Sequence, residues 1–249
     1  MIERVLVTGA SRGIGRAVVE ALLADGRRVA AVARDRRRLE TLEGAHAVSR
    51  DLSDPGGVVA EAVAALGGVD GLVHAAGIAE HAPLEAISVS AVDRAHALHV
   101  RAPLVLAQDL AAHLRGQGRP GSIVMVTSTL ASRPAPTTLA YAASKAALTT
   151  LTRGLALELA ADGIRVNAVA PGVVDTDMVR ALRLAPGEEA PVGEARVQRL
   201  EQQLATLRDL HPLGRLGTPV EVAAAILHAL DAGWMTGSVV TLDGGLTLR

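Results

Sequence analysis

Two residues capable of acid–base chemistry, Tyr141 and Lys145, stand four positions apart in a segment with helical patterning. They are the only tyrosine and the only lysine of the chain, which uses arginine at every other Lys/Arg position. Residues at this spacing share one face of a helix. A tyrosine hydroxyl, with an ordinary pKa of about 10, exchanges protons poorly at neutral pH, but an adjacent ammonium group favours the phenolate. The pair therefore predicts a phenol with a lowered pKa that acts as a general acid or base.

Ser128 follows an apolar run at 122–127 that is patterned as a buried strand. In open parallel sheets, ligands bind at the carboxyl ends of the strands. A hydroxyl at that edge can hydrogen-bond a substrate oxygen and stabilise the charge that develops on it. The alternative is a local turn cap within 127–129. The presence of Tyr141 favours a role for Ser128 in the chemistry.

A glycine-rich turn follows the first apolar run, at 4–8, and leads directly into an expected helix at 13–24. Glycines let the backbone turn sharply and approach a pyrophosphate closely, and a helix N-terminus offers free N–H groups and a partial positive charge. A glycine-rich motif in the first strand–helix turn predicts a dinucleotide site. Its expected cofactor contacts are Gly9, Ser11, Arg12, Gly13, Ile14 and Gly15.

Apolar runs alternate with amphipathic helix patterns along the chain, which predicts the α/β class. We expect a single-domain, doubly wound parallel sheet of Rossmann type, with about seven strands and with helices on both faces. The expected strands are 4–8, 28–33, 45–49, 69–74, 122–127, 164–170 and 238–242, and the longer helices are 13–24, 55–66, 89–115, 139–161 and 220–230.

One segment, from Pro171 to Pro212, has no strand pattern. Within it Val197, Leu200, Leu204 and Leu207 have helical spacing. A long irregular segment after a sheet strand is typical of a lid over a site, here at about 173–212. A surface insertion that packs one helix on the core is the alternative.

Composition excludes several classes of protein. The net charge of -1 gives no basic field for nucleic acid or an acidic membrane surface. The chain has no cysteine, which excludes disulfides, and its eight histidines show no zinc-type pattern, so no metal is expected. No apolar run reaches the roughly 18 residues of a membrane span, and the first residues lack a signal-peptide pattern. We expect a cytoplasmic protein.

These motifs together resemble the short-chain dehydrogenase/reductase family. The turn Thr8-Gly9-Ala10-Ser11-Arg12-Gly13-Ile14-Gly15 has its T-G-x-x-x-G-x-G spacing, and Ser128 precedes Tyr141-Ala-Ala-Ser-Lys145 at its usual distance. Matches at Thr236-Gly237 and Asp243-Gly244-Gly245 extend the resemblance to the end of the chain. It implies one NAD(P)-binding oxidoreductase domain over 1–249. Further cofactor contacts are implied at Asp51, Leu52, Ala76, Gly77, Pro171, Gly172, Val174 and Thr176, besides Tyr141 and Lys145.

The resemblance also implies a reaction, the interconversion of a ketone and a secondary alcohol by hydride transfer with a nicotinamide. Tyr141 supplies the proton, Ser128 positions the oxygen, and Lys145 lowers the pKa of Tyr141 and holds the ribose. The run Thr176-Asp177-Met178 is similar both to 3-oxoacyl-carrier-protein reductases and to dihydro-dihydroxybenzoate dehydrogenases. The alternatives are an NAD-dependent dehydrogenase of a cyclic diol or alcohol, and a non-catalytic NADP-binding sensor or scaffold.

Two arginines favour NADP(H). Arg12 lies inside the glycine turn, and Arg34 follows the second strand, where the adenine ribose is expected. A guanidinium group binds a 2′-phosphate well, whereas an acidic residue at the end of that strand would favour NAD. Arg34 could instead begin a solvated helix, and Asp35 could contact the ribose, which makes NAD(H) the alternative.

The sequence departs from the family's pattern at two places. His99 stands where the family has an asparagine that completes a proton relay to the lysine, and His74-Ala75 replaces two further asparagines. His99 could join the relay, because imidazole titrates near neutral pH, or it could replace a structural side chain, which we expect.

The expected helix at 139–161 is apolar on almost every face, so one side is available to a partner subunit. The family resemblance implies dimers or tetramers formed through such a face, so we expect a homo-oligomer with closed symmetry. We expect a small-molecule carbonyl or alcohol as the substrate.

Overall fold

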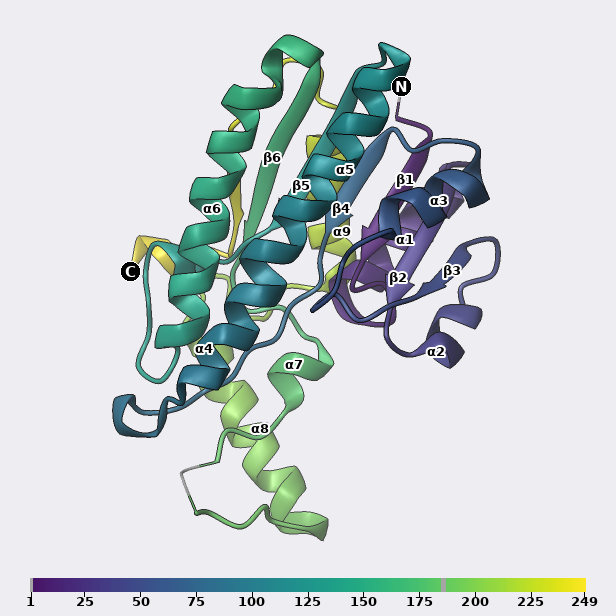
Figure 1. Cartoon of the computed structure of the whole chain (residues 1–249). Coiled ribbons are helices and arrows are strands. Elements are labelled where there is room, and N and C mark those ends of the chain that lie inside the picture. Colours follow the sequence, from purple (N-terminus) through teal and green to yellow (C-terminus); the bar gives the residue numbers. More distant parts are fainter. Residues whose placement is uncertain (1, 185–186) are drawn as a thin grey trace.

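The protein is described by a computed structural model over residues 2–184 and 187–249. Seven parallel strands form one sheet in the order β3-β2-β1-β4-β5-β6-β7, and helices cover both of its faces (Figure 1). This confirms the expected doubly wound α/β fold. Residues 185–186, inside the segment expected as a lid at 173–212, lie outside the described residues.

The seven expected strands are all present, and their ends differ from the predicted ones by no more than two residues. The strands are β1 Arg4–Thr8, β2 Arg28–Ala33, β3 His46–Ser49, β4 Gly71–His74, β5 Gly121–Val126, β6 Ile164–Pro171 and β7 Val239–Leu242. The helices are α1 Gly13–Ala24, α2 Arg36–Glu40, α3 Val58–Leu66, α4 Val89–His96, α5 Ala102–Gln117, α6 Leu139–Leu159, α7 Asp177–Arg180, α8 Gly193–Asp209 and α9 Pro219–Asp231.

The chain reverses direction across the sheet between β1 and β4, which are hydrogen-bonded neighbours although β2 and β3 separate them in sequence. In a doubly wound sheet such a reversal leaves a crevice at the carboxyl ends of the two strands. The glycine turn after β1 and the loop after β4 therefore meet at the edge where a ligand is expected.

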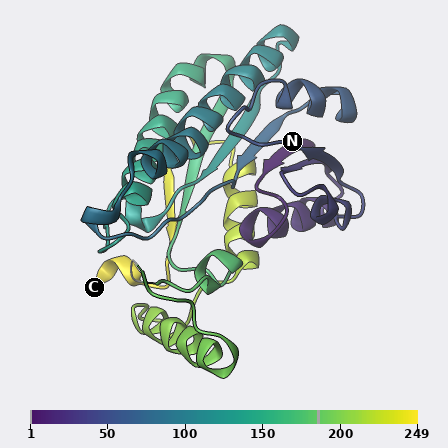
Figure 2. The same ribbon diagram turned by 60° about the horizontal axis from the view of Figure 1, so that its bottom comes forward.

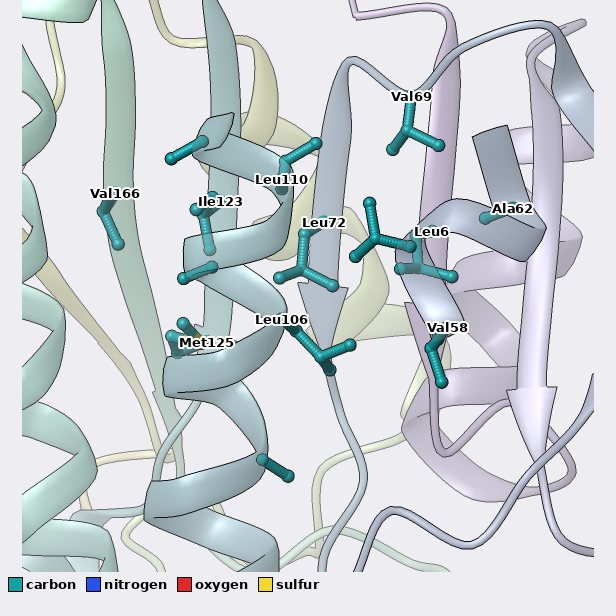
Figure 3. Packing of buried hydrophobic residues seen from close by; sticks show 14 of the residues in the cluster. Leu6, Val58, Ala62, Val69, Leu72, Leu106, Leu110, Ile123, Met125 and Val166 are labelled. Atoms are coloured by element: carbon teal, nitrogen blue, oxygen red, sulfur yellow. The ribbon is translucent and has the colours of Figure 1, made fainter. Parts of the chain in front are cut away.

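Two apolar layers fix the sheet between its helices. On one face, Leu72, Ile123 and Met125 of the strands pack against Leu106 and Leu110 of α5 (Figure 3). The second layer joins β1, β2, β5 and β6 to α1 and α9 through aliphatic residues such as Val18, Leu22 and Ile226. Burying each such side chain contributes roughly 1.5–3 kcal/mol, so aliphatic groups alone make a stable core in a chain without phenylalanine.

The helix expected at 89–115 is interrupted. It consists of α4, a π-helical turn η2 at Ala97–Arg101, and α5. A π turn carries one residue more than an α-helical turn and often lies at a functional site. Here it contains His99, whose side chain is fully buried beneath the loop that follows β4.

Helices α7 and α8 extend beyond the carboxyl ends of the strands, at the bottom of Figure 1, and Figure 2 views them from that side. The helical spacing noted at 197–207 falls within α8. Leu204 and Leu207 of α8 form a small cluster with Leu216, separate from the two sheet layers. Along 2–184 and 187–249, no helix is both long and apolar enough to cross a membrane.

Candidate active site

The glycine turn is shaped by close backbone contacts. A side chain at Gly9, which has a φ of +69°, would place its Cβ 2.7 Å from the backbone of Ala76, and one at Gly15 would place its Cβ 2.3 Å from the Gly9 carbonyl oxygen. Neither contact is compatible with a Cβ atom, so the turn is compact because both positions are glycine. It brings the turn after β1 directly against the loop after β4.

The N-terminus of α1 has the properties of an anion site. Its cap residue, Arg12, makes no side-chain cap hydrogen bond, and the first turn contains no acidic residue. The first N–H groups of a helix lack partners inside the helix and carry partial positive charge. The donors expected at Ser11, Gly13 and Ile14 therefore suit the pyrophosphate of a dinucleotide.

The other predicted cofactor residues lie along the same edge. Asp51 and Leu52 follow β3, Ala76 and Gly77 follow β4, and Pro171, Gly172, Val174 and Thr176 end or follow β6. Thr176 approaches the glycine turn, because a Cβ at Gly13 would lie 3.2 Å from its methyl group. The fold thus brings segments from three distant parts of the sequence to one edge of the sheet.

Ser128, Tyr141 and Lys145 meet at the end of β5. Tyr141 lies in the first turn of α6 with Lys145 one turn further on, and the Lys145 ammonium nitrogen is 5.7 Å from the centroid of the tyrosine ring. The Ser128 hydroxyl lies close enough to the Tyr141 hydroxyl to act on its pKa. It also accepts a hydrogen bond from the Leu130 N–H at 3.1 Å, so the local cap and the link to tyrosine coexist in one side chain.

Burial dominates the acid–base properties of this group. The expectation of a lowered Tyr141 pKa is wrong for this structure: burial raises that pKa, and the neighbouring Ser128 hydroxyl opposes this rise only in part. Lys145 is itself 4% exposed, and burial lowers its pKa to about 7. Its ammonium group donates to the Val126 carbonyl at 2.8 Å. Spacing alone places the two side chains on one face, but it does not reveal that both are desolvated.

The two arginines of the predicted NADP site lie apart from this buried group. Arg34 is exposed just after β2, near Asp51, whose pKa is lowered first by the Ser53 N–H and also by the charge of Arg34. Arg12 lies 3.5 Å from the Asp177 carboxylate, and Arg38 lies 3.6 Å from the same group. Sequence reasoning overlooked Arg38 and the ion-pairing role of Asp177, because that contact joins α7 to α2 across the fold.

Both histidines that depart from the family's pattern are buried beside the site. His74 and His99 are 0% exposed. The rings of His99 and Tyr141 meet edge to face, with centroids 5.6 Å apart and an interplanar angle of 88°. Ser144, which the sequence analysis did not single out, links His99 to Tyr141, because its hydroxyl hydrogen-bonds His99 Nδ1 and donates to the Tyr141 carbonyl oxygen.

Comparison with known proteins agrees with this geometry. The family model described as short chain dehydrogenase matches residues 3–187. L-xylulose reductase of Homo sapiens is 37% identical over 249 residues, which cover 98% of this chain and 96% of that protein. D-erythrulose reductase of Gallus gallus is 36% identical, with 98% and 95% covered.

Solved structures give the same result. A putative 2-deoxy-D-gluconate 3-dehydrogenase from Agrobacterium tumefaciens with bound NADP is 31% identical with a TM-score of 0.83, and the match covers 99% of this chain and 97% of that one. A 4-hydroxyisoleucine dehydrogenase complexed with NADH is 25% identical with a TM-score of 0.86, covering 99% of both chains.

The chain therefore belongs to the short-chain dehydrogenase/reductase family. It is an NAD(P)-dependent oxidoreductase that interconverts alcohols and ketones.

Proposed function

We propose that the protein is an NADP(H)-dependent reductase of a small hydroxyketone, with Tyr141 as the general acid in reduction and the general base in oxidation. The observation that carries the proposal is the group at the end of β5, where the Tyr141 side chain lies between the Ser128 hydroxyl and the buried Lys145 ammonium. A sensor that binds a nucleotide without turnover needs no such group.

The bound nicotinamide would supply or accept the hydride at the carbon of the substrate. Ser128 donates a hydrogen bond to the substrate oxygen and so stabilises the negative charge that develops there. Tyr141 gives its hydroxyl proton to that oxygen, which completes the alcohol. Lys145 then faces the phenolate, which its positive charge stabilises.

The pKa values of this group suit a proton handed from one residue to the next. Lys145, with a pKa of about 7, exchanges a proton with its surroundings near neutral pH. Tyr141, whose pKa is raised by burial, takes a proton back readily once it has lost one. The phenolate therefore persists only while the reacting oxygen or the neighbouring ammonium stabilises it.

The preference for NADP(H) rests on charge. The proposal is supported by Arg12 in the glycine turn and by Arg34, exposed directly after β2, and Arg38 shares the Asp177 carboxylate with Arg12. Guanidinium groups at this place favour a ligand with an additional phosphate. The proposal of a hydroxyketone substrate is supported by two relatives, which are named as reductases of L-xylulose and D-erythrulose.

A panel of carbonyl compounds tests the proposal. Purified protein is incubated with NADPH or NADH and with L-xylulose, D-erythrulose, a 3-oxoacyl thioester or a cyclic ketone, and the loss of reduced nicotinamide is followed by absorbance. We expect turnover of a hydroxyketone, faster with NADPH, and at least about a hundredfold slower in Tyr141→Phe. Turnover by Tyr141→Phe at the wild-type rate, or oxidation of a cyclic diol with NAD as the only activity, would contradict it.

We also propose that the segment at 173–212 acts as a lid and that the protein forms a homo-oligomer. The lid is supported by α7 and α8, which stand over the carboxyl edge (Figure 2). The oligomer is supported by apolar side chains on the surface, with Leu157 of α6 83% exposed and Trp234 fully exposed. Sedimentation analysis of the wild type and of Leu157→Glu would test the oligomer, because a charge in an interface should favour smaller species.

A further inference from the structure

Two buried histidines fasten the loop after β4 to the π-helical turn. His74 ends β4, His99 lies in η2, and the residues between His74 and Ile78 carry the predicted cofactor contacts Ala76 and Gly77. Each imidazole is hydrogen-bonded through both ring nitrogens.

The partners of His99 determine which of its nitrogens carries the proton. The Ile78 N–H donates to Nε2 at 3.1 Å, so Nε2 must be an acceptor. Nδ1, 2.7 Å from the Ser144 hydroxyl, therefore bears the hydrogen and donates it. The Ser144 hydroxyl in turn donates to the Tyr141 carbonyl oxygen at 2.7 Å. All three hydrogen bonds therefore point from donor to acceptor in the same direction, from the loop after β4 to the backbone of Tyr141.

His74 is held in the opposite tautomer. Its Nε2 lies 3.1 Å from the Leu98 carbonyl oxygen, which can only accept, so Nε2 carries the hydrogen. Its Nδ1 accepts from the Thr8 hydroxyl at 3.0 Å, and the Thr8 oxygen accepts from the Ala76 N–H at 3.3 Å. The loop is thus fixed at Ala76 through β1 and at Ile78 through His99.

Both rings are neutral. Burial lowers the pKa of His74 to about 3, and the charge of Lys145 acts in the same direction. Burial also lowers the pKa of His99 far below its ordinary value, with the charges of Lys145, His74 and His96 adding to that effect. A neutral imidazole has an acceptor and a donor on either side of one carbon atom, which is the arrangement of a primary amide.

We propose that His99 is a positioning residue that acts as an amide-like bridge: it fixes Tyr141 and the Gly77 loop relative to each other, and it exchanges no proton during the reaction. Two observations of close packing support this role besides the hydrogen bonds. The ring of His99 packs edge to face on that of Tyr141. A Cβ placed on Gly77 would lie 3.0 Å from His99 Nε2, so the loop passes directly over the imidazole. The effect on turnover rests on the reduction proposed above.

Substitution by amides separates positioning from proton transfer. His99→Asn and His99→Gln offer one donor and one acceptor without a group that titrates, whereas His99→Leu offers neither. The matched control is His228→Asn, on the exposed face of α9. The kcat, the KM for the ketone and the pH dependence of kcat/KM are measured for each variant with NADPH.

We expect His99→Leu to lower kcat on the order of ten- to a hundredfold with KM little changed, because a misplaced phenol slows the chemical step. At least one of the two amides should restore kcat to within about fivefold of the wild type with the same pH profile, since it keeps both bonds. Wild-type kcat in His99→Leu, amides as slow as leucine, or a shifted pH profile in the amide variants would overturn the proposal.

A second measurement needs neither turnover nor a variant. Nitrogen NMR of histidine-labelled protein distinguishes the two tautomers of neutral imidazole. We expect His99 with hydrogen on Nδ1 and His74 with hydrogen on Nε2, both unchanged between about pH 5 and 8, where a free imidazole would titrate. The reverse tautomer, or titration, at His99 would overturn the proposal. If the ketone panel fails while these spectra hold, the proposed reaction is wrong but the bridge is not.

Discussion

The candidate site at the carboxyl edge of the sheet has two halves that differ in their contact with water. In the half around β5, η2 and α6, Ser128, Lys145 and His99 are all less than 10% exposed, and each has defined hydrogen-bond partners. In the half around α2 and the glycine turn, the side chains of Arg12 and Arg38 are 56% and 51% exposed. Buried polar groups are costly to disturb because no water replaces a lost partner, whereas exposed charges are screened. Substitutions in the first half should therefore have large effects on turnover or stability. Substitutions in the second half should have small effects on cofactor binding that depend on the salt concentration.

The largest expected effect is that of Tyr141→Phe. Removing the hydroxyl removes the only proton donor proposed at the substrate oxygen, and kcat should fall on the order of 10²- to 10⁴-fold. Binding of NADPH, measured by calorimetry, should change little, since the ring and its packing on His99 remain. A fall in NADPH affinity as large as the fall in kcat would mean that the substitution disturbs both halves of the site, which would remove the distinction between them.

Lys145→Met tests burial directly through the pH dependence of stability. The pKa of Lys145 is about 7 in the folded protein, against an ordinary value of 10.5. Between these values the unfolded chain binds a proton that the folded protein does not, so this group makes wild-type stability rise with pH by ~1.4 kcal/mol per pH unit. The variant lacks this slope. The free energy of unfolding of the variant minus that of the wild type should therefore be highest at and below pH 7 and should decline towards pH 10.

Urea unfolding without cofactor at a series of pH values measures this difference. Arg153→Met, an exposed arginine on the same helix, is the matched control and should show a difference that is independent of pH. A pH-independent difference for Lys145→Met as well would mean that the ammonium is solvated, and the buried half would then resemble the exposed one.

The two halves also differ in what the sequence could predict. The strands and the glycine turn were predictable because a buried parallel strand is a short apolar run and the turn requires glycine at Gly9 and Gly15. The pairing of Tyr141 with Lys145 followed from helical spacing. The direction of the Tyr141 pKa did not, because it depends on how much protein covers both groups, which spacing along one helix does not report.

Contacts between distant segments were likewise hidden. The π turn at Ala97–Arg101 contains the buried imidazole of His99. Its hydrogen-bond partners, Ile78 and Ser144, belong to a loop and to another helix, so the sequence around the turn does not reveal them. The pairing of Asp177 with two arginines joins three elements. Local patterns give the elements, whereas such contacts arise only from packing.

Arg34→Gln should separate the two cofactors. Loss of one guanidinium from an exposed phosphate site should weaken NADPH binding about tenfold, because a hydrogen bond to a charged group is lost but water replaces part of it. NADH, which lacks the 2′-phosphate, should bind almost as before. Calorimetry with both cofactors measures this, and Arg37→Gln, the exposed neighbour on α2, is the control. An equal loss for NADH would place Arg34 away from the 2′-phosphate.

The smallest expected effect is that of Asp177→Asn, which tests the exposed half at its most sensitive point. The Asp177 carboxylate stands within 3.5 Å of Arg12 and 3.6 Å of Arg38 and is itself 55% exposed. If the 2′-phosphate of NADPH binds the same guanidinium groups, the Asp177 carboxylate competes with that phosphate. Removing the charge of the carboxylate should then tighten NADPH binding by only about two- to fivefold, because exposed ion pairs are weak. The gain in NADPH affinity should shrink as the salt concentration is raised, because screening reduces the competition.

Glu201→Gln, which removes the exposed partner of Arg208 on α8, is the control and should not change NADPH affinity. A gain that is large, or that persists at high salt, would mean that Asp177 and the arginines meet away from water, and the contrast between the two halves would no longer hold.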